Sequence, residues 1–146
     1  MIASALIVKM AEYYENKGQT LFDRLQELSD KHGYCLESLH SAVIQQDKQK
    51  KIMSRLREGV SIKGLTKTED YLPGLKERPP ADVIKLYFEL PGEEPPVKAW
   101  AAIRPSGTEP KLKIYTGVHA KTEKAAETSL ETLTEKLMNI LSLTPQ

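Results

Sequence analysis

One segment of the sequence gathers side chains that suit phosphate. It runs without a break through Arg104, Pro105, Ser106, Gly107, Thr108, Glu109, Pro110 and Lys111. An arginine offers paired donors for two phosphate oxygens, hydroxyls donate single hydrogen bonds, and a glycine lets successive backbone N–H groups turn toward an anion. Two prolines stiffen the segment, so less conformational entropy is lost when a ligand binds. These residue types predict a phosphate-binding loop, although composition alone also fits a solvated turn flanked by charges. The glycine spacings of nucleotide-binding loops are absent from the sequence.

Strands must hold this loop, because apolar and polar residues alternate on both sides of it. The alternation covers residues 97–103 and 112–118, and also residues 83–90 earlier in the chain. A period of two is typical of strands with one buried face. A weaker strand signal at 60–65 leads into a loop over 69–82 that is rich in proline and charge. We predict an antiparallel sheet of four strands.

Two helices are predicted to cover one face of that sheet. The first is capped by Asp47 and ends at Gly59, and the second begins near Thr122 and carries an apolar seam as far as Leu141. An antiparallel sheet with helices packed on one face is an α+β arrangement. The predicted fold class is therefore α+β.

The beginning of the chain has a different, helical character. Residues 2–17 are apolar almost all round, a pattern typical of a helix inside a larger structure. A second helix is predicted from a capping box of Thr20 and Asp23 to Gly33, followed by an extended connector over residues 34–44. The apolar helix needs a partner surface, which could be the next helix, a second copy of the chain or the rest of a longer polypeptide.

The change from a helical pattern at the beginning of the chain to the pattern of a sheet with helices predicts a domain boundary near residue 45. Residues 1–45 would be a helical tail with a connector, and residues 46–146 would form the domain that carries the phosphate loop.

Composition excludes several other classes of function. The 146 residues carry 21 basic and 20 acidic side chains, a net charge of +1, which gives no field for holding a nucleic-acid backbone. The apolar stretch at residues 2–14 is shorter than the ~20 residues that a membrane span needs. Cys35 is the single cysteine, so no internal disulfide or cysteine-based zinc site is expected, and a reducing cytoplasm fits best.

The order of residues in the loop resembles a known signature. Arg104 to Lys111, followed by Leu112-Lys113-Ile114-Tyr115, is similar to the last domain of the α-D-phosphohexomutases, the phosphoglucomutase/phosphomannomutase family. Asp70-Tyr71, the stretch from Pro80 to Leu90, Trp100 and the closing helix also sit where bacterial members place similar residues. The resemblance implies that residues 2–44 are the end of the preceding, third domain.

The resemblance also implies a function. Members interconvert hexose 1-phosphate and hexose 6-phosphate through a phosphoserine and a bisphosphate intermediate. The last domain grips the substrate phosphate that is not being transferred. The residues implied here are Arg104, Ser106, Gly107 and Thr108, with Lys111 and Lys113 as weaker candidates. Glu109 is expected to fix the loop or to meet a neighbouring basic group.

The family's other functional segments are absent from this sequence. It has no Ser-His-Asn phosphoserine segment, no Asp-Gly-Asp-Gly-Asp metal loop and no Gly-Glu-Glu-Ser sugar-recognition segment. The chain is therefore expected to carry no catalytic residue and no ligand of the Mg²⁺ that the whole enzyme uses, and to be inactive without the upstream domains. The alternative is a stand-alone module that binds or senses a phosphosugar with the same loop.

Overall fold

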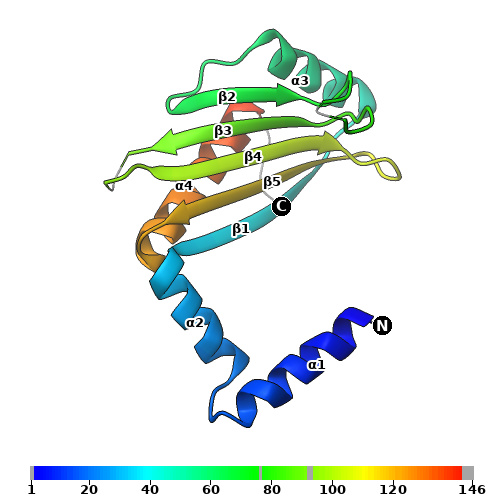
Figure 1. Ribbon diagram of the computed structural model, residues 1–146. Coiled ribbons are helices and arrows are strands. Elements are labelled where there is room, and N and C mark those ends of the chain that lie inside the picture. Colours follow the sequence, from blue (N-terminus) through cyan, green and yellow to red (C-terminus); the bar gives the residue numbers. More distant parts are fainter. Residues whose placement is uncertain (1, 76, 92–93, 143–146) are drawn as a thin grey trace.

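The structure, a computed structural model, describes residues 2–75, 77–91 and 94–142. Figure 1 shows a twisted sheet with two helices on one face, and a pair of helices that extends away from one end of it. The helices are α1 (Ile2–Glu15), α2 (Leu21–His32), α3 (Gln46–Glu58) and α4 (Glu123–Ile140). The strands are β1 (Tyr34–Val43), β2 (Leu65–Asp70), β3 (Ile84–Leu90), β4 (Val97–Pro105) and β5 (Lys111–Ala120). All neighbouring strands are antiparallel, in the order β1-β5-β4-β3-β2.

The centre of the sheet follows the alternation in the sequence. Strands β3 and β4 form a hairpin whose inward residues are buried, and β5 pairs with β4 in the same manner. Helix α3 and helix α4 cover the inward face, with the side chains of Met53 and Leu56 from α3 and of Leu133 and Leu137 from α4 almost fully buried. The predicted α+β class is confirmed, because one apolar face of an antiparallel sheet is covered by two helices.

The sheet has five strands, so the predicted number of four is wrong. The additional strand is β1, which occupies the segment expected to be an extended connector and pairs with β5 from Tyr34 opposite Ala120 to Val43 opposite Lys111. Its inward positions include Ser38 and His40, whereas Leu39 and Val43 are exposed. Because apolar residues are not confined to one face, the period of two is hidden in the sequence.

Two smaller expectations also need correction. The strand expected at residues 60–65 begins only at Leu65 and runs to Asp70, along the edge of the sheet beside β3. Helix α3 is preceded by Gln45 as its N-cap, without a side-chain capping hydrogen bond. Asp47 lies in the first turn instead, where a negative charge favours the positive end of the helix.

The two N-terminal helices lie outside the core. The capping box of α2 is present as predicted, since the Asp23 backbone N–H donates to Thr20 Oγ1 at 3.1 Å and the Thr20 backbone N–H donates to Asp23 Oδ2 at 2.7 Å. Neither α1 nor α2 contributes a buried residue, and the apolar side chains of α1 are largely exposed. Among the described residues, no helix combines the length and apolar character that crossing a bilayer requires.

Candidate functional site

The loop between β4 and β5 is closed at its base by backbone hydrogen bonds. The Ser106 N–H donates to the Lys111 carbonyl at 2.8 Å, and the Lys111 N–H donates to the Glu109 carbonyl at 2.7 Å. The N–H of Ile44, just after β1, donates to the Pro110 carbonyl at 2.9 Å. Neighbouring strands and the end of β1 therefore fix the loop in place before any ligand binds.

A pocket of about 360 Å³ lies between this loop and the first turns of α3. Its lining residues come from the loop, from α3 and from the segment before β3. They are Gln46, Gln49, Lys50, Asp82, Pro105, Ser106, Gly107, Thr108, Glu109 and Pro110. The N-terminal end of a helix offers backbone N–H groups and a partial positive charge, both of which favour an anion. The pocket therefore joins a hydroxyl-bearing loop to a second source of hydrogen-bond donors that the sequence reasoning had not identified.

The remaining predicted site residues lie on the other side of the loop. Arg104 and Lys113 are directly opposite each other on β4 and β5, and Lys111 is two positions before Lys113 on the same face. This is the face away from α3 and α4, named here the open face. The structure therefore splits the six predicted residues: Ser106, Gly107 and Thr108 line the pocket, and three cations lie beside it at the end of the open face.

The charges of these three cations are not equally available. Lys111 Nζ lies 3.2 Å from Glu109 Oε1, so Glu109 meets a neighbouring basic group as expected. Within the ranges that the structure describes, Arg104 and Lys113 form no ion pair. Arg104, which is exposed, and Lys113, which is half-buried, are thus the cations best able to meet an anion.

The backbone conformation at Gly107 does not require a glycine. Its φ lies outside the left-handed region, and a Cβ added there would meet no atom within 4 Å. The surface beside Gly107 is open, which leaves room for a ligand against the main chain.

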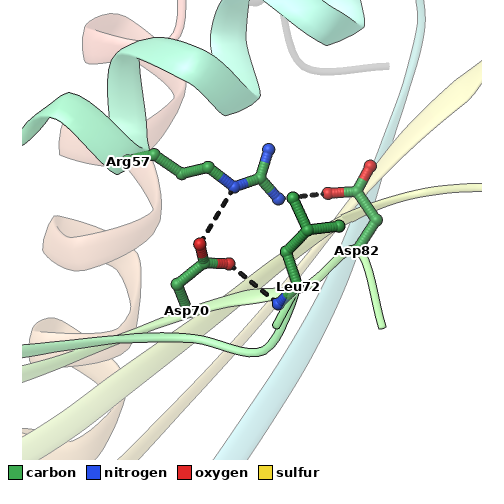
Figure 2. A network of polar contacts seen from close by, with 4 residues as sticks. All are labelled: Arg57, Asp70, Leu72 and Asp82. Atoms are coloured by element: carbon green, nitrogen blue, oxygen red, sulfur yellow. Dashed lines mark hydrogen bonds and ion pairs between the residues drawn. The ribbon is translucent and has the colours of Figure 1, made fainter. Parts of the chain in front are cut away.

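Asp82 brings a negative charge to the pocket, and a network of polar contacts offsets it (Figure 2). Arg57, from the end of α3, bonds to Asp82 through Nη2 and to Asp70 Oδ2 through Nε at 3.2 Å. Asp70 Oδ1 accepts a hydrogen bond from the Leu72 N–H at 3.0 Å. Partial burial lowers the pKa of Arg57, but its hydrogen bonds to Asp82 and Asp70 outweigh this effect and raise the pKa overall.

Sequence reasoning missed this network because its members come from three separate segments. Arg57 belongs to α3, Asp70 ends β2 and Asp82 precedes β3, and no short spacing connects them. Among the described residues, no group of three or more His, Cys, Asp or Glu side chains is arranged to hold a metal ion.

Comparison with known proteins finds a family match that includes this loop. Residues 97–135, which include β4, the loop and β5, match the family described as phosphoglucomutase/phosphomannomutase, C-terminal domain. A phosphoglucomutase of Staphylococcus haemolyticus is 32% identical over 130 residues, which cover 75% of this chain and 22% of the relative. Phosphoglucomutases of Staphylococcus epidermidis and Staphylococcus aureus are 32% and 29% identical, with the same coverage. The chain spans about a fifth of the length of these relatives, 22%.

The chain thus contains an α+β domain with a cation-flanked loop between β4 and β5. The chain carries a phosphohexomutase C-terminal domain, so the resemblance seen in the loop is confirmed.

Proposed function

We propose that this chain is the part of a phosphoglucomutase/phosphomannomutase that binds the substrate phosphate. The complete enzyme would interconvert hexose 1-phosphate and hexose 6-phosphate through a phosphoserine and a bisphosphate intermediate. The main support is the match over residues 97–135, because it contains the β4–β5 loop. A pocket lies on one side of this loop, and Arg104 and Lys113, which form no ion pair among the described residues, lie on the other side. The relatives named phosphoglucomutase support the same reaction class.

The proposed binding mode assigns different tasks to the two sides of the loop. We propose that phosphate is held by the side chains of Arg104, Ser106, Thr108, Lys111 and Lys113 and by the backbone N–H of Gly107. A guanidinium engages two phosphate oxygens at once and fixes the orientation of the group, while hydroxyls and backbone N–H groups satisfy the remaining oxygens. The ion pair between Arg57 and Asp82 reduces the repulsion that Asp82 would exert on the bound phosphate.

Phosphoryl transfer itself needs groups that we assign to the upstream domains. A bound Mg²⁺ would neutralise charge on the transferred phosphoryl group, and its ligands and the serine nucleophile would lie outside this chain. The contribution of this chain is positioning: by gripping one phosphate, it holds the other end of the sugar at the distance that reaction requires.

We also propose that α1 and α2 are the end of the preceding domain. Their exposed apolar side chains support this assignment, because such a surface is stabilised when another part of the polypeptide covers it. The domain that binds phosphate would begin with β1, so the expected boundary near residue 45 would move to about residue 33. A cytoplasmic location agrees with the single, unpaired Cys35.

The proposal is tested by replacing Arg104 with alanine in the complete polypeptide that contains this chain. A charge-assisted bidentate contact contributes ~1.5 to 3 kcal/mol, so kcat/KM for a hexose phosphate should fall by about 10- to 150-fold or more. Lys98→Ala is the matched control, because Lys98 is an exposed cation near the opposite end of β4. An unchanged kcat/KM in Arg104→Ala would refute the assigned role. If the 146-residue chain alone, free of contaminating mutase, converted glucose 1-phosphate, the assignment of the catalytic groups to the upstream domains would be refuted.

A second candidate function is a stand-alone module that binds a phosphosugar without converting it. It is favoured by one observation: the sheet, α3 and α4 form a continuous core without help from α1 or α2. The mass of the native polypeptide, measured with an antibody against α4, separates the two candidates. A species several times heavier than 16.4 kDa supports the mutase, and a species of 16.4 kDa supports the module.

A further inference from the structure

A second polar cluster lies on the open face of the sheet, around Glu69 of β2. Lys67 Nζ lies 2.6 Å from Glu69 Oε1, and the hydroxyls of Tyr71 and Tyr87 each donate to Glu69 Oε2 at 2.9 Å. Glu69 is only 8% exposed. Its charge is therefore met within the protein by a cation and two hydroxyls.

These contacts shift the pKa values of Glu69 and Tyr87. Hydrogen bonds from Lys67, Tyr87 and Tyr71 lower the pKa of Glu69 to about 2, and burial together with the Glu69 carboxylate raises the pKa of Tyr87 to about 12. At neutral pH the Glu69 carboxylate is therefore ionised and the Tyr87 hydroxyl keeps its proton. Among the described residues, Glu69 thus accepts hydrogen bonds from Lys67, Tyr71 and Tyr87.

Two further cations border the cluster and are not needed to hold it together. Lys85 Nζ lies 5.1 Å from the ring centroid of Tyr87 and 4.7 Å from that of Trp100. Arg78 is exposed in the segment between β2 and β3. Over the described part of the chain, neither Lys85 nor Arg78 forms an ion pair.

The aromatic platform under Lys85 is itself fixed. Trp100 lies next to Gly117 of β5, where an added Cβ would come within 2.5 Å of the indole ring. The indole therefore packs closely against the backbone at Gly117, and Lys85 lies over this ring and over that of Tyr87. Its ammonium is oriented by the rings while its N–H donors stay available.

The cluster and the two cations enclose a pocket of about 420 Å³. Among the described residues, three cations and one carboxylate line it, which gives a net charge of +2. A volume above ~300 Å³ is in the range of small-molecule sites. Its lining shares no residue with the pocket at the β4–β5 loop. The two pockets are near each other on the sheet, since Lys85 is opposite Ala102, two positions before Arg104.

We propose that the pocket around Lys67, Arg78 and Lys85 is a second anion site, which binds a small phosphate-bearing molecule independently of the β4–β5 loop. A phosphate dianion matches the net charge of +2 and offers acceptors to the two unpaired cations and to the remaining donors of Lys67. Glu69 does not repel this ligand strongly, because its charge is already compensated by Lys67 and the two hydroxyls.

The test is a titration of the 146-residue chain with inorganic phosphate, followed by amide chemical shifts in ¹⁵N spectra. Two groups of amides should move with separate dissociation constants, one around residues 106–109 and one around residues 66–71 and 85–87. The double variant Lys85→Gln/Arg78→Gln should weaken the second response at least tenfold and leave the first unchanged. Both positions are outside the core, so the variant is expected to keep the dispersed spectrum of the folded chain.

Lys98→Gln is the matched control, an exposed lysine on the open face away from the pocket. The proposal is overturned if phosphate moves only the loop amides, if the double variant behaves like Lys98→Gln, or if sodium chloride of equal ionic strength produces the same shifts. Glucose 6-phosphate is titrated in a parallel arm. Equal affinity means that the phosphate group alone is recognised, and tighter binding means that the sugar is also contacted.

The same experiment separates this inference from the proposed function. Arg104→Ala should abolish the loop response and leave the response at residues 66–71 intact. If Arg104→Ala changes neither response, the proposed role of the β4–β5 loop fails while the second site stands.

Discussion

Helices α1 and α4 show that the apolar content of a helix does not determine how much of it is buried. Helix α1 is apolar almost all round, yet it has no buried residue. Helix α4 contains many charged and polar residues, but its seam buries Ala126, Leu133, Leu137 and Met138 against the sheet. Burial thus depends on a complementary surface and on the placement of apolar residues, and total apolar content does not determine it.

The largest expected effect comes from truncating one leucine in each region. Leu86→Ala, at a side chain with 0% exposure in β3, should lower the free energy of unfolding by ~2 to 5 kcal/mol, because it removes buried contacts and leaves a cavity. Leu6→Ala, at a side chain 64% exposed in α1, should change it by less than ~0.5 kcal/mol. Urea unfolding followed by the fluorescence of Trp100, the single tryptophan, measures both. Equal losses would mean that α1 packs in solution.

A smaller effect is expected from adding one methyl group at a glycine. Gly117→Ala would press a Cβ to within 2.5 Å of the Trp100 ring, so the strand or the ring must shift at a cost of ~1 to 3 kcal/mol. Gly107→Ala is the matched control, since nothing lies within 4 Å of its added Cβ, and we expect a change below ~0.5 kcal/mol. Chemical denaturation compares the two variants. A stable Gly117→Ala protein would show that the indole is free to move.

Acid should weaken the sheet gradually through Glu69. Its pKa in the folded protein is about 2, below the ordinary value of 4.5, so its contribution to stability is present above pH 4.5 and is lost as the pH falls toward 2. The free energy of unfolding of the native sequence should therefore decline over this range more steeply than that of Glu69→Gln. Trp100 fluorescence in urea at pH 2 to 6 gives both curves. Parallel curves would contradict the assigned protonation of the cluster.

The most local effect is expected from the helix caps. Thr20 caps α2 and Thr122 caps α4, and each replacement by alanine costs ~1 kcal/mol of helix stability. Thr122→Ala should lower the unfolding midpoint reported by Trp100, because α4 belongs to the core. Thr20→Ala should reduce helicity by circular dichroism and leave that midpoint unchanged. A lower unfolding midpoint in Thr20→Ala would show that the stability of α2 is coupled to that of the sheet.

The regular alternation in β3, β4 and β5 made the central sheet predictable. In those strands the inward residues are apolar except Thr116, and the outward residues are mostly polar, so the sequence pattern alone shows which face of each strand is buried. Strand β1 could not be recognised in this way, because Ser38 bonds to His40 on its inward side at 2.9 Å while Leu39 is exposed. Its place in the sheet follows from pairing with β5, a contact between distant segments.

The candidate site was predictable where its residues are consecutive. The loop from Arg104 to Lys111 was identified by residue types and order, whereas the α3 side of the pocket, Asp82 and its partner Arg57 were not. The pocket around Lys85 was also missed, since its residues come from β2, β3 and the segment between them. Only the register of the strands brings these side chains together.

The pairing of β1 with β5 has a practical consequence for isolating the domain. A shorter chain that starts after residue 45 would lack β1, and the backbone groups of β5 that pair with it would lie along an open edge. An unprotected edge of ten residues is a template for pairing between molecules, so such a chain is expected to aggregate. A chain that starts at residue 33 keeps the edge covered and discards the exposed apolar surface of α1 and α2.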